Sequence, residues 1–371
     1  MAPQGPALVV LSHLRWTDVW QRPQQIVSRL AAHRRTWFLE APLWAAVARP
    51  RLRHEQAGTV TRVWLELPGE PGEVPPEVSE PAWRTYVGLL DGTLGDAAQG
   101  SDVWLYTPMA LAVARSLRPR LTVYDVMDDL ASFADGGPHL SMMQQQALSE
   151  ADLVFAGGRS LYRLATAVRG AAPTHLFPSG VDTVHYATSR PLRRARRAVD
   201  GRPVAGFVGV LDERLDRDLI AALAAVLADW RVEMVGPVKK IAPAVLPVAS
   251  NLHYPGARPY GELPETMAGF DVGLLPFAVG EATRSISPTK TLEYLAAGLP
   301  VVSTRIPDVV ADWSEVARFA DTGAEFAAAC QAVLDDPVDE RDRRLAPLLP
   351  RYEWDAIATE MDALLRRWGW T

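Results

Sequence analysis

The sequence predicts an α/β chain made of two successive doubly wound units, each with a parallel sheet covered by helices. Short apolar runs alternate with helical patterns through both halves of the 371-residue chain, and this alternation is typical of parallel sheets. The alternation is interrupted once, by a charged stretch at 189–202 with an arginine run. A chain of this length also exceeds what one core usually holds. We therefore expect two domains.

The elements of the first half follow from apolar periodicity. Runs that predict strands lie at 7–11, 36–39, 102–106, 121–124, 152–156 and 174–177. Segments with helical spacing lie between them, at 23–33, 109–117, 140–150 and 159–168. These elements predict a first Rossmann-like domain over residues 1–188.

The second half repeats the pattern after the charged stretch, which we interpret as a solvated linker over 189–202. Strands are expected at 204–208, 232–235, 252–254, 271–275 and 301–303, and helices at 217–230, 263–269 and 288–297. The second domain is therefore expected over 203–350. A last amphipathic helix, rich in tryptophan and leucine, is expected within 351–371.

Composition narrows the class of protein. Hydrophobic residues make up 48% and charged residues 22% of the chain, as in a soluble globular protein. The net charge of −6 disfavours a general nucleic-acid binder, whose footprint is usually basic. One cysteine, Cys330, allows neither an intrachain disulfide nor a cysteine metal cluster. No signal peptide or spanning segment is visible, so we expect a cytoplasmic protein and leave peripheral membrane contact open.

The segment 287–304 is the most informative part of the chain. Ser287 has the residue type of an N-cap, and Pro288 then suits the first helical position. Gly298 is a typical residue to end a helix, and Pro300 prevents its continuation. The apolar residues from Val301 onward predict a buried strand.

Lys290 and Glu293 are candidate binding residues near the start of this helix. Being three apart, they lie on one face. A helix N-terminus with a lysine in its first turn suits phosphate, and a carboxylate one turn on can accept hydrogen bonds from a sugar diol. The alternative is an ordinary solvated ion pair. Lysine occurs only at 239, 240 and 290, whereas arginine supplies the rest of the 38 basic residues, and this usage favours a phosphate site.

The position of these lysines in the predicted sheet supports a shared site. Ligands of open parallel sheets bind beyond the carboxyl ends of the strands. Lys239 and Lys240 follow the predicted strand 232–235, and Ser287 follows the strand 271–275. Both groups are therefore expected at one edge of the second domain, where they could share a diphosphate.

The chain resembles the GT-B glycosyltransferases, particularly the bacterial family 4 (group 1) enzymes. The resemblance is carried by residues 12–24, 124–129, 177–182, 209–216 and 287–304. It implies two Rossmann-like doubly wound domains facing a central cleft, with the nucleotide sugar, for example a UDP-sugar, held mainly by the second. It also implies that the C-terminal helix crosses back to the first domain, and it implies a hexosyltransferase activity.

The resemblance also implies roles for individual residues. Glu293 would bind the ribose hydroxyls, and the turn with Ser287, Thr289 and Lys290 would bind the diphosphate. Arg214 or Lys240 would supply a second positive contact, and the segment with Arg258 and Tyr260 would lie beside the base. The sequence departs from the family at one point, because Ser285 stands where the first of two glutamates is expected.

The chemical step demands stabilisation of the leaving diphosphate, which fixed positive groups can supply. No Asp-x-Asp motif is present at a strand end, so we expect neither a metal nor any other cofactor. Asp125, Asp128 and Asp129 follow the strand 121–124, and one of them could position or deprotonate the acceptor hydroxyl. The alternative is that Asp128 or Asp129 only caps the next turn.

Further candidates follow the first strand. His13, Arg15, Trp16 and Arg22 could contact the acceptor or the donor phosphate, although each could instead be structural. The predicted function is transfer of a sugar from a nucleotide-diphosphate sugar to an acceptor hydroxyl, with retention and without metal; the acceptor is a glycan, a lipid or a small molecule. The alternatives are a sugar-nucleotide epimerase, a phosphorylase, and a two-domain binding protein without catalysis.

Overall fold

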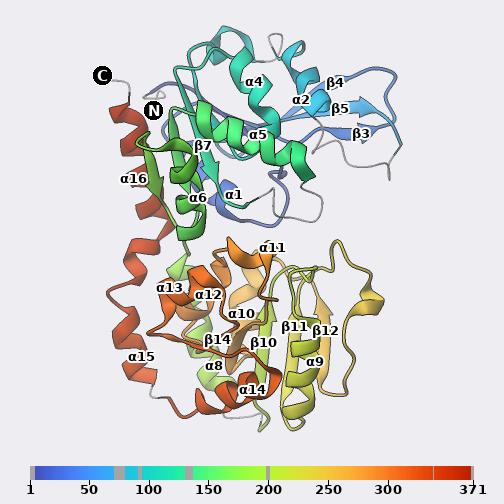
Figure 1. Ribbon diagram of the computed structural model, residues 1–371, viewed down its shortest axis with the longest axis vertical. Coiled ribbons are helices and arrows are strands. Elements are labelled where there is room, and N and C mark those ends of the chain that lie inside the picture. Colours follow the sequence, from blue (N-terminus) through green and yellow to red (C-terminus); the bar gives the residue numbers. More distant parts are fainter. Residues whose placement is uncertain are drawn as a thin grey trace. The chain divides into compact units, whose positions relative to one another are not determined.

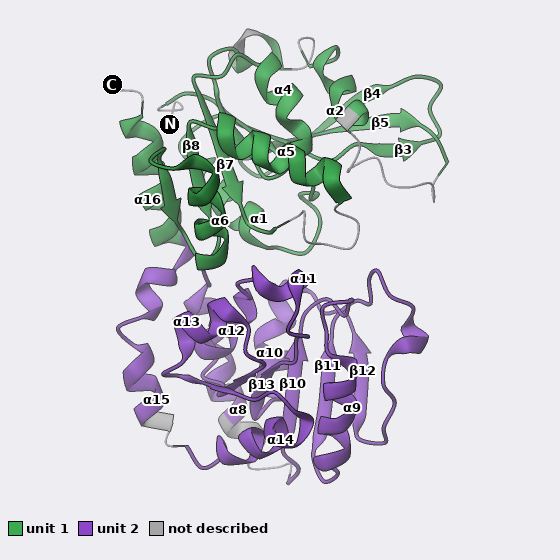
Figure 2. Cartoon of the chain, in the orientation of Figure 1, with its two compact units in different colours: residues 1–178, 355–371 green, residues 179–354 purple. Residues whose placement is uncertain are grey.

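The computed structural model describes residues 5–70, 80–90, 94–129, 137–197, 201–336 and 338–368. The chain divides into two compact units (Figure 2). Unit 1 comprises residues 1–178 and 355–371, and unit 2 comprises residues 179–354. Both contain a largely parallel sheet with helices (Figure 1), so the predicted α/β doubly wound class is confirmed. No helix among the described residues is long and apolar enough to cross a membrane.

The sheet of unit 1 is built around β1 (Leu8–Leu11), which is fully buried. Its strands are ordered β3-β5-β2-β1-β6-β7-β8-β9. Their bounds are β2 (Thr36–Leu39), β3 (Leu43–Ala45), β5 (Val60–Pro68), β6 (Asp102–Leu105), β7 (Leu121–Val126), β8 (Leu153–Ala156) and β9 (Thr174–Leu176). The helices are α1 (Arg22–Leu30), α2 (Glu80–Val87), α4 (Leu111–Ser116), α5 (Gly137–Glu150) and α6 (Arg159–Arg169). The predicted strand over 36–39 has the observed bounds.

A hairpin in unit 1 was not predicted. Strand β4 (Arg51–Ala57) pairs antiparallel with β5 around a tight turn, in which Gly58 has φ +62°. No residue of β4 is buried. The strand therefore lacks the apolar alternation by which a half-buried strand is recognised.

Unit 2 has strands in the order β12-β11-β10-β13-β14-β15, all parallel, which is the Rossmann order. Their bounds are β10 (Val204–Val208), β11 (Arg231–Val235), β12 (Leu252–Gly256), β13 (Val272–Leu275), β14 (Val301–Ser303) and β15 (Ala317–Phe319). Helices α9 (Arg217–Val226) and α14 (Gly323–Ala332) pack together on one face, and α8 (Ser189–Arg197) packs with α10 (Leu263–Ala268) on the other (Figure 1). The remaining helices are α7 (Thr183–Ala187), α11 (Glu281–Arg284), α12 (Thr289–Ala296) and α13 (Pro307–Trp313).

The segment interpreted as a linker is instead helical and belongs to unit 2. Residues 189–197 form α8, and residues 198–200 lie outside the described part of the chain. Ser189 is buried and its hydroxyl donates to the Ala297 carbonyl at 3.0 Å, while Arg190 pairs with Asp342 at 2.7 Å. The arginine content suggested a solvated linker. An arginine can, however, bury the aliphatic part of its side chain while its guanidinium stays paired.

The chain passes between the units twice, at 178/179 and at 354/355. The residues that follow the first passage and precede the second lie side by side in unit 2. The Val181 N–H donates to the Tyr352 carbonyl at 2.7 Å, and Val181 and Glu353 form a parallel bridge. Thr183 also hydrogen-bonds Glu353. The predicted boundaries at 188 and 350 therefore differ from the observed ones by several residues.

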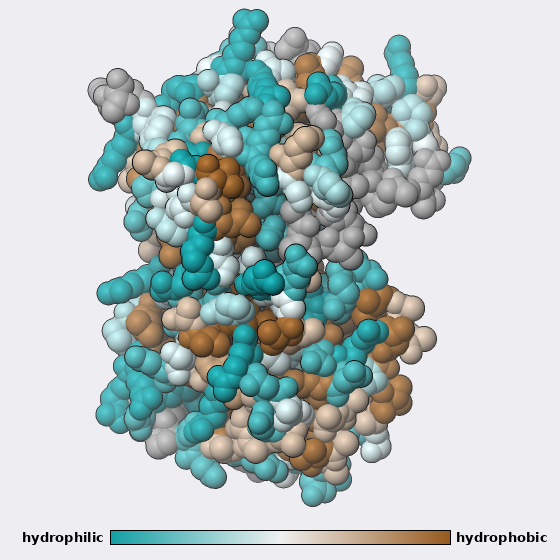
Figure 3. Space-filling view, viewed as in Figure 1, coloured by the Kyte–Doolittle hydropathy of each residue, from teal (hydrophilic) through white to brown (hydrophobic). Residues whose placement is uncertain are grey.

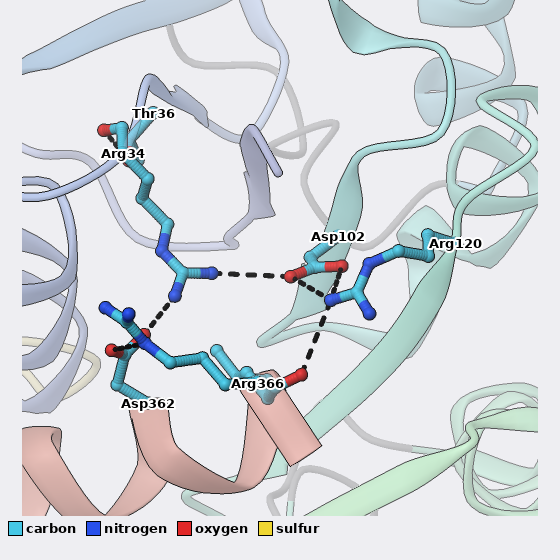
Figure 4. A network of polar contacts seen from close by, with 7 residues as sticks. Arg34, Thr36, Asp102, Arg120, Asp362 and Arg366 are labelled. Atoms are coloured by element: carbon cyan, nitrogen blue, oxygen red, sulfur yellow. Dashed lines mark hydrogen bonds and ion pairs between the residues drawn. The ribbon is translucent and has the colours of Figure 1, made fainter. Parts of the chain in front are cut away.

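The last helices are α15 (Val338–Leu345) in unit 2 and α16 (Trp354–Arg367), whose residues from 355 onward belong to unit 1. A network of charges holds α16 to the sheet of unit 1 (Figure 4). Arg34 contacts both Asp102, at 3.3 Å, and Asp362 of α16. Arg120 contacts Asp102 at 2.6 Å and the Leu365 carbonyl at 3.4 Å. Asp102 is fully buried, so the network neutralises a carboxylate at the start of β6.

Candidate functional site

The predicted donor-binding residues all lie beyond the carboxyl ends of strands in unit 2. Arg214 follows β10 and Lys240 follows β11, while Arg258 and Tyr260 follow β12. The four others follow β13: Ser287, Thr289, Lys290 and Glu293. Strands β10 and β13 are neighbours at the point where the strand order reverses, and this switch point is where doubly wound sheets bind ligands.

Backbone hydrogen bonds join three of these loops. The Leu211 N–H donates to the Pro237 carbonyl at 2.9 Å, and the Lys239 N–H donates to the Leu211 carbonyl at 3.1 Å. The Ala278 N–H donates to the Arg214 carbonyl at 2.9 Å. The loops after β10, β11 and β13 therefore form one bonded layer.

A close approach of two glycines lets this layer form. Gly236 has φ +153°, and a Cβ there would lie 1.7 Å from the Gly209 carbonyl oxygen. No side chain can be accommodated at that distance. Gly236 was not singled out from the sequence, because a single glycine after a strand does not reveal which backbone approaches it.

Replacing Gly236 with alanine is expected to lower the free energy of unfolding by about 2–4 kcal/mol, since the new Cβ forces the two loops apart. Urea denaturation measures the change. Gly261→Ala is the matched control, because a Cβ at Gly261 meets no atom within 4 Å. Equal stability of the two variants would contradict the proposed close approach.

The helix α12 begins one residue later than predicted. Pro288 is the N-cap with an extended ψ of 118°, and no side chain caps the helix, so the prediction that Ser287 is the N-cap is wrong. The end of the helix is as predicted. Gly298 has φ +74°, its N–H donates to the Leu295 carbonyl, and the Leu299 N–H donates to the Tyr294 carbonyl. These are the two hydrogen bonds of a Schellman motif.

The first turns of α12 carry the predicted charged pair. The Lys290 Nζ lies 2.6 Å from a Glu293 carboxylate oxygen, and the two side chains are 22% and 11% exposed. The hydroxyl of Thr291, one residue after Lys290, is buried without a hydrogen-bond partner among the described residues. A positive charge and a carboxylate thus lie together near the start of α12.

Tyr294 fixes α12 against the sheet. The Val208 N–H, at the end of β10, donates to the Tyr294 phenol oxygen at 2.7 Å. A Cβ at Gly273 of β13 would lie 2.6 Å from the Tyr294 ring, so the glycine makes room for the ring. Because Glu293 precedes Tyr294 in α12, these contacts of Tyr294 also fix the position of Glu293 relative to the sheet.

The variant Tyr294→Phe is expected to lose about 1–3 kcal/mol in the free energy of unfolding, because it leaves the buried Val208 N–H unpaired. Tyr254→Phe serves as the control, since its phenol donates to the Pro247 carbonyl in a partly exposed loop where water can replace it. A loss no larger than that of the control would contradict the anchoring role.

Two residues of α7 join the site without having been predicted. The His185 ring stacks on Tyr260 with centroids 4.4 Å apart and an angle of 9°, and its Nε2 lies 3.1 Å from the Tyr260 carbonyl oxygen. Burial raises the pKa of Tyr186, and the nearby Glu293 charge acts in the same direction. His185 is partly exposed despite this stack. The available signal was Asp182, which caps α7 by accepting from the His185 N–H.

Two further cations of this edge, Arg214 and Lys240, have acidic neighbours. Asp212 is buried and accepts hydrogen bonds from the Arg214 Nε at 3.0 Å and from its terminal nitrogen at 2.6 Å. The carboxylate therefore fixes the direction of the guanidinium. Lys240 has φ +62° and lies 3.8 Å from Glu213, a longer and more exposed pair.

In unit 1, Asp125 and Arg22 form a buried ion pair. Asp125 is a residue of β7, which extends two residues beyond the predicted strand, and both side chains are at most 1% exposed. The Arg22 Nε donates to both carboxylate oxygens at 3.0 Å, and its Nη1 donates to the Phe177 carbonyl at 2.8 Å. Burial raises the pKa of Asp125, and Arg22 opposes this shift. This geometry argues against direct contact with an acceptor for either residue.

The other candidates of unit 1 differ in accessibility. Trp16 is buried against Phe38, with centroids 5.1 Å apart, so it is a packing residue. His13 and Arg15 are partly exposed in the loop after β1. Asp128 and Asp129 are also partly exposed, and Asp129 accepts a 3.4 Å hydrogen bond from Gln144. Among the described residues, no group of three or more histidines, cysteines or carboxylates is placed to hold a metal.

Comparisons with known proteins agree with this architecture. Residues 202–336 match the family model "Glycosyl transferases group 1". Over 201 residues the chain is 27% identical to TuaH of Bacillus subtilis (strain 168), which is described as a teichuronic acid biosynthesis glycosyltransferase. The match covers 51% of this chain and 49% of TuaH, so this chain matches about half the length of that relative.

Solved structures match nearly the whole chain. Sucrose-phosphate synthase from Thermosynechococcus elongatus has a TM-score of 0.75 at 15% identity, over 98% of this chain and 99% of that one. An Escherichia coli trehalose-6-phosphate structure, bound with UDP-2-fluoro glucose, has a TM-score of 0.70 at 15% identity, over 97% and 98%. These matches confirm the predicted GT-B fold.

Proposed function

We propose that this GT-B chain, whose second unit carries a glycosyl transferases group 1 domain, transfers a sugar from a nucleotide-diphosphate sugar to an acceptor hydroxyl. One observation carries the proposal. The Lys290–Glu293 pair lies near the start of α12, at the switch point of the sheet and inside the segment that matches the family model.

The donor is proposed to bind along this edge of unit 2. The N-terminal end of α12 and Lys290 suit a diphosphate, with Arg214 or Lys240 as a second cation. A diphosphate that engages Lys290 leaves the Glu293 carboxylate available for the ribose hydroxyls. Tyr260, held by His185, and Arg258 would lie beside the base. The E. coli structure bound with UDP-2-fluoro glucose supports UDP as the nucleotide.

In the proposed reaction the bond between the sugar C1 and the diphosphate oxygen breaks, and its electron pair passes to the diphosphate. The acceptor oxygen forms the new bond to C1, and its proton passes to the leaving diphosphate. Lys290 and the helix N-terminus stabilise the negative charge that develops on the leaving group, so we propose a metal-independent reaction. Ser285 stands where the family has the glutamate that is expected near the donor sugar. Retention at C1 is therefore proposed from the family resemblance and not from a residue of the site.

Unit 1 is proposed to supply the acceptor contacts. Asp128 is partly exposed, unlike Asp125, and we propose that it positions the acceptor hydroxyl together with His13 and Arg15. Asp125 and Arg22 would then act through packing, since their buried pair ties β7 to α1.

Nucleotide release provides the test. The purified chain is incubated with UDP-, GDP-, dTDP- and ADP-sugars and an acceptor panel, with and without EDTA, and thermal shift is recorded for each free nucleotide. We expect stabilisation by one nucleotide and acceptor-dependent release that persists in EDTA. Conversion of the sugar nucleotide without release would indicate an epimerase, and a requirement for phosphate would indicate a phosphorylase. Absence of stabilisation by every nucleotide at millimolar concentration would reject the proposal.

Replacing Glu293 with alanine is expected to weaken nucleotide binding about 10- to 100-fold, which corresponds to loss of charge-assisted hydrogen bonds to the ribose. Isothermal titration calorimetry measures the affinity. Glu265→Ala, an exposed glutamate of α10, is the control and should bind as the parent does. A 2′,3′-dideoxy nucleotide should bind the parent and Glu293→Ala equally weakly. If Glu293→Ala still prefers the ribose nucleotide over the dideoxy nucleotide, the ribose assignment is refuted.

A further inference from the structure

A loop of unit 2 exposes an uninterrupted apolar segment. From Ile241 to Ala249 every residue is apolar, and none of them is buried. Val248 is 95% exposed and Val245 is 44% exposed, and the residues 242–244 are exposed as well. Scattered exposed apolar residues are ordinary in proteins, whereas a contiguous run indicates a contact surface. We call residues 241–249 the apolar loop.

The apolar loop is held in place by contacts with the core of unit 2 and with β12. Leu246 and Ala249 pack against the core of unit 2, and the Tyr254 phenol of β12 donates to the Pro247 carbonyl at 2.8 Å. Residues 243–245 form a short 3₁₀ turn. Figure 1 shows the turn as the tip of a projection beside β12, and Figure 3 shows apolar surface on that side of unit 2. The exposed valines are therefore presented by an ordered loop.

The charges around the loop have one sign along the chain. Lys239 and Lys240 precede it and are exposed, and no aspartate or glutamate occurs from 234 to 261. Lys240 lies 3.8 Å from Glu213, an exposed pair of the kind that contributes little. In a chain with net charge −6, this stretch is complementary to an anionic surface.

The residue types distinguish between two occupants. Protein interfaces are enriched in aromatic residues, methionine and arginine, and their hot spots rarely consist of valine. The apolar loop has none of the enriched types; it contains alanine, proline, valine, leucine and isoleucine. Aliphatic side chains suit shallow insertion at the headgroup level of a bilayer, and the adjoining lysines suit anionic lipids.

We propose that the apolar loop is a membrane-docking element, in which Val245 and Val248 enter the interface of an anionic bilayer and Lys239 contacts the lipid headgroups. The proposal is independent of the transfer reaction, because the loop lies outside the residues assigned to donor or acceptor. In this proposal the loop attaches the protein to the lipid surface and does not span the membrane.

Vesicle flotation tests the proposal with the full chain. We expect binding to vesicles of 70% phosphatidylcholine and 30% phosphatidylglycerol, and at least fivefold less binding to pure phosphatidylcholine. The double variant Val245→Ser/Val248→Ser should lower the bound fraction at least fivefold, and Lys239→Gln should lower binding to the anionic vesicles only. Val226→Ser is the matched control, since Val226 is an isolated valine of α9 with 52% exposure, and it should bind as the parent does.

Two measurements separate docking from other causes. The thermal midpoint of the double variant should equal that of the parent, because serine replaces side chains that are already exposed. The mass from light scattering should also be unchanged. Parent protein that does not float with anionic vesicles, or a double variant that floats equally well, overturns the proposal. A dimer that dissociates in the double variant would assign the loop to a second copy of the chain and overturn it as well.

Discussion

Replacing Lys290 with alanine is expected to lower kcat for sugar transfer about 10²- to 10³-fold, the effect typical of removing one fixed group that stabilises charge in a transition state. The charge on the diphosphate grows as the bond to C1 breaks, so the loss should fall mainly on kcat and less on KM. The Lys290 ammonium already lies 2.6 Å from Glu293. This ion pair holds the ammonium near the first turn of α12 until a diphosphate engages it.

Nucleotide release under saturating donor measures this effect. Arg305→Ala is the control, because Arg305 forms an exposed pair with Asp321 in the same unit and should leave kcat unchanged. Donors with better leaving groups should lose less activity in Lys290→Ala than the natural nucleotide does. A kcat within threefold of the parent would show that Lys290 has no role in leaving-group stabilisation.

The variant Arg22→Met is expected to lower the free energy of unfolding by about 3–5 kcal/mol. Breaking a buried pair by removing one partner leaves an uncompensated charge, here on Asp125. The Phe177 carbonyl also loses its 2.8 Å hydrogen bond. Denaturant unfolding followed by tryptophan fluorescence reports the change.

The double variant Arg22→Met/Asp125→Leu separates charge from packing. Because it removes both charges, it should recover much of the lost stability. Arg115→Met is the control, since the Arg115–Glu150 pair is 47% and 39% exposed and should contribute less than about 1 kcal/mol. A double variant as unstable as the single one would mean that shape, not charge, explains the loss.

Buried strands were the best predicted part of the fold. The strands over 204–208 and 301–303 have their predicted bounds because each is an apolar run between turn residues. Strand β4 and helix α8 were missed for a shared reason. Both are rich in charged residues and lack the apolar periodicity that identifies buried elements. Strand β4 is held by pairing with the next strand, β5, and Ser189 of α8 contacts Ala297, 108 residues away.

Most local features of the candidate site were predictable, with the Ser287 N-cap as the exception, whereas its long-range contacts were not. Gly298 and the Lys290–Glu293 spacing follow from rules that act within a few residues. The Arg22–Asp125 pair joins residues 103 apart, and the His185–Tyr260 stack joins residues 75 apart. A carboxylate near a strand end therefore has the same sequence signal whether it faces a substrate or a buried guanidinium.

The charge network around Asp102 has a consequence for the order in which the chain folds during synthesis. Unit 1 is discontinuous: Arg34, Asp102 and Arg120 are made early, but Asp362 and Leu365 are made after all of unit 2. Domains usually fold from the N-terminus as they emerge from the ribosome. Here unit 2 can close first, and the N-terminal unit is completed last.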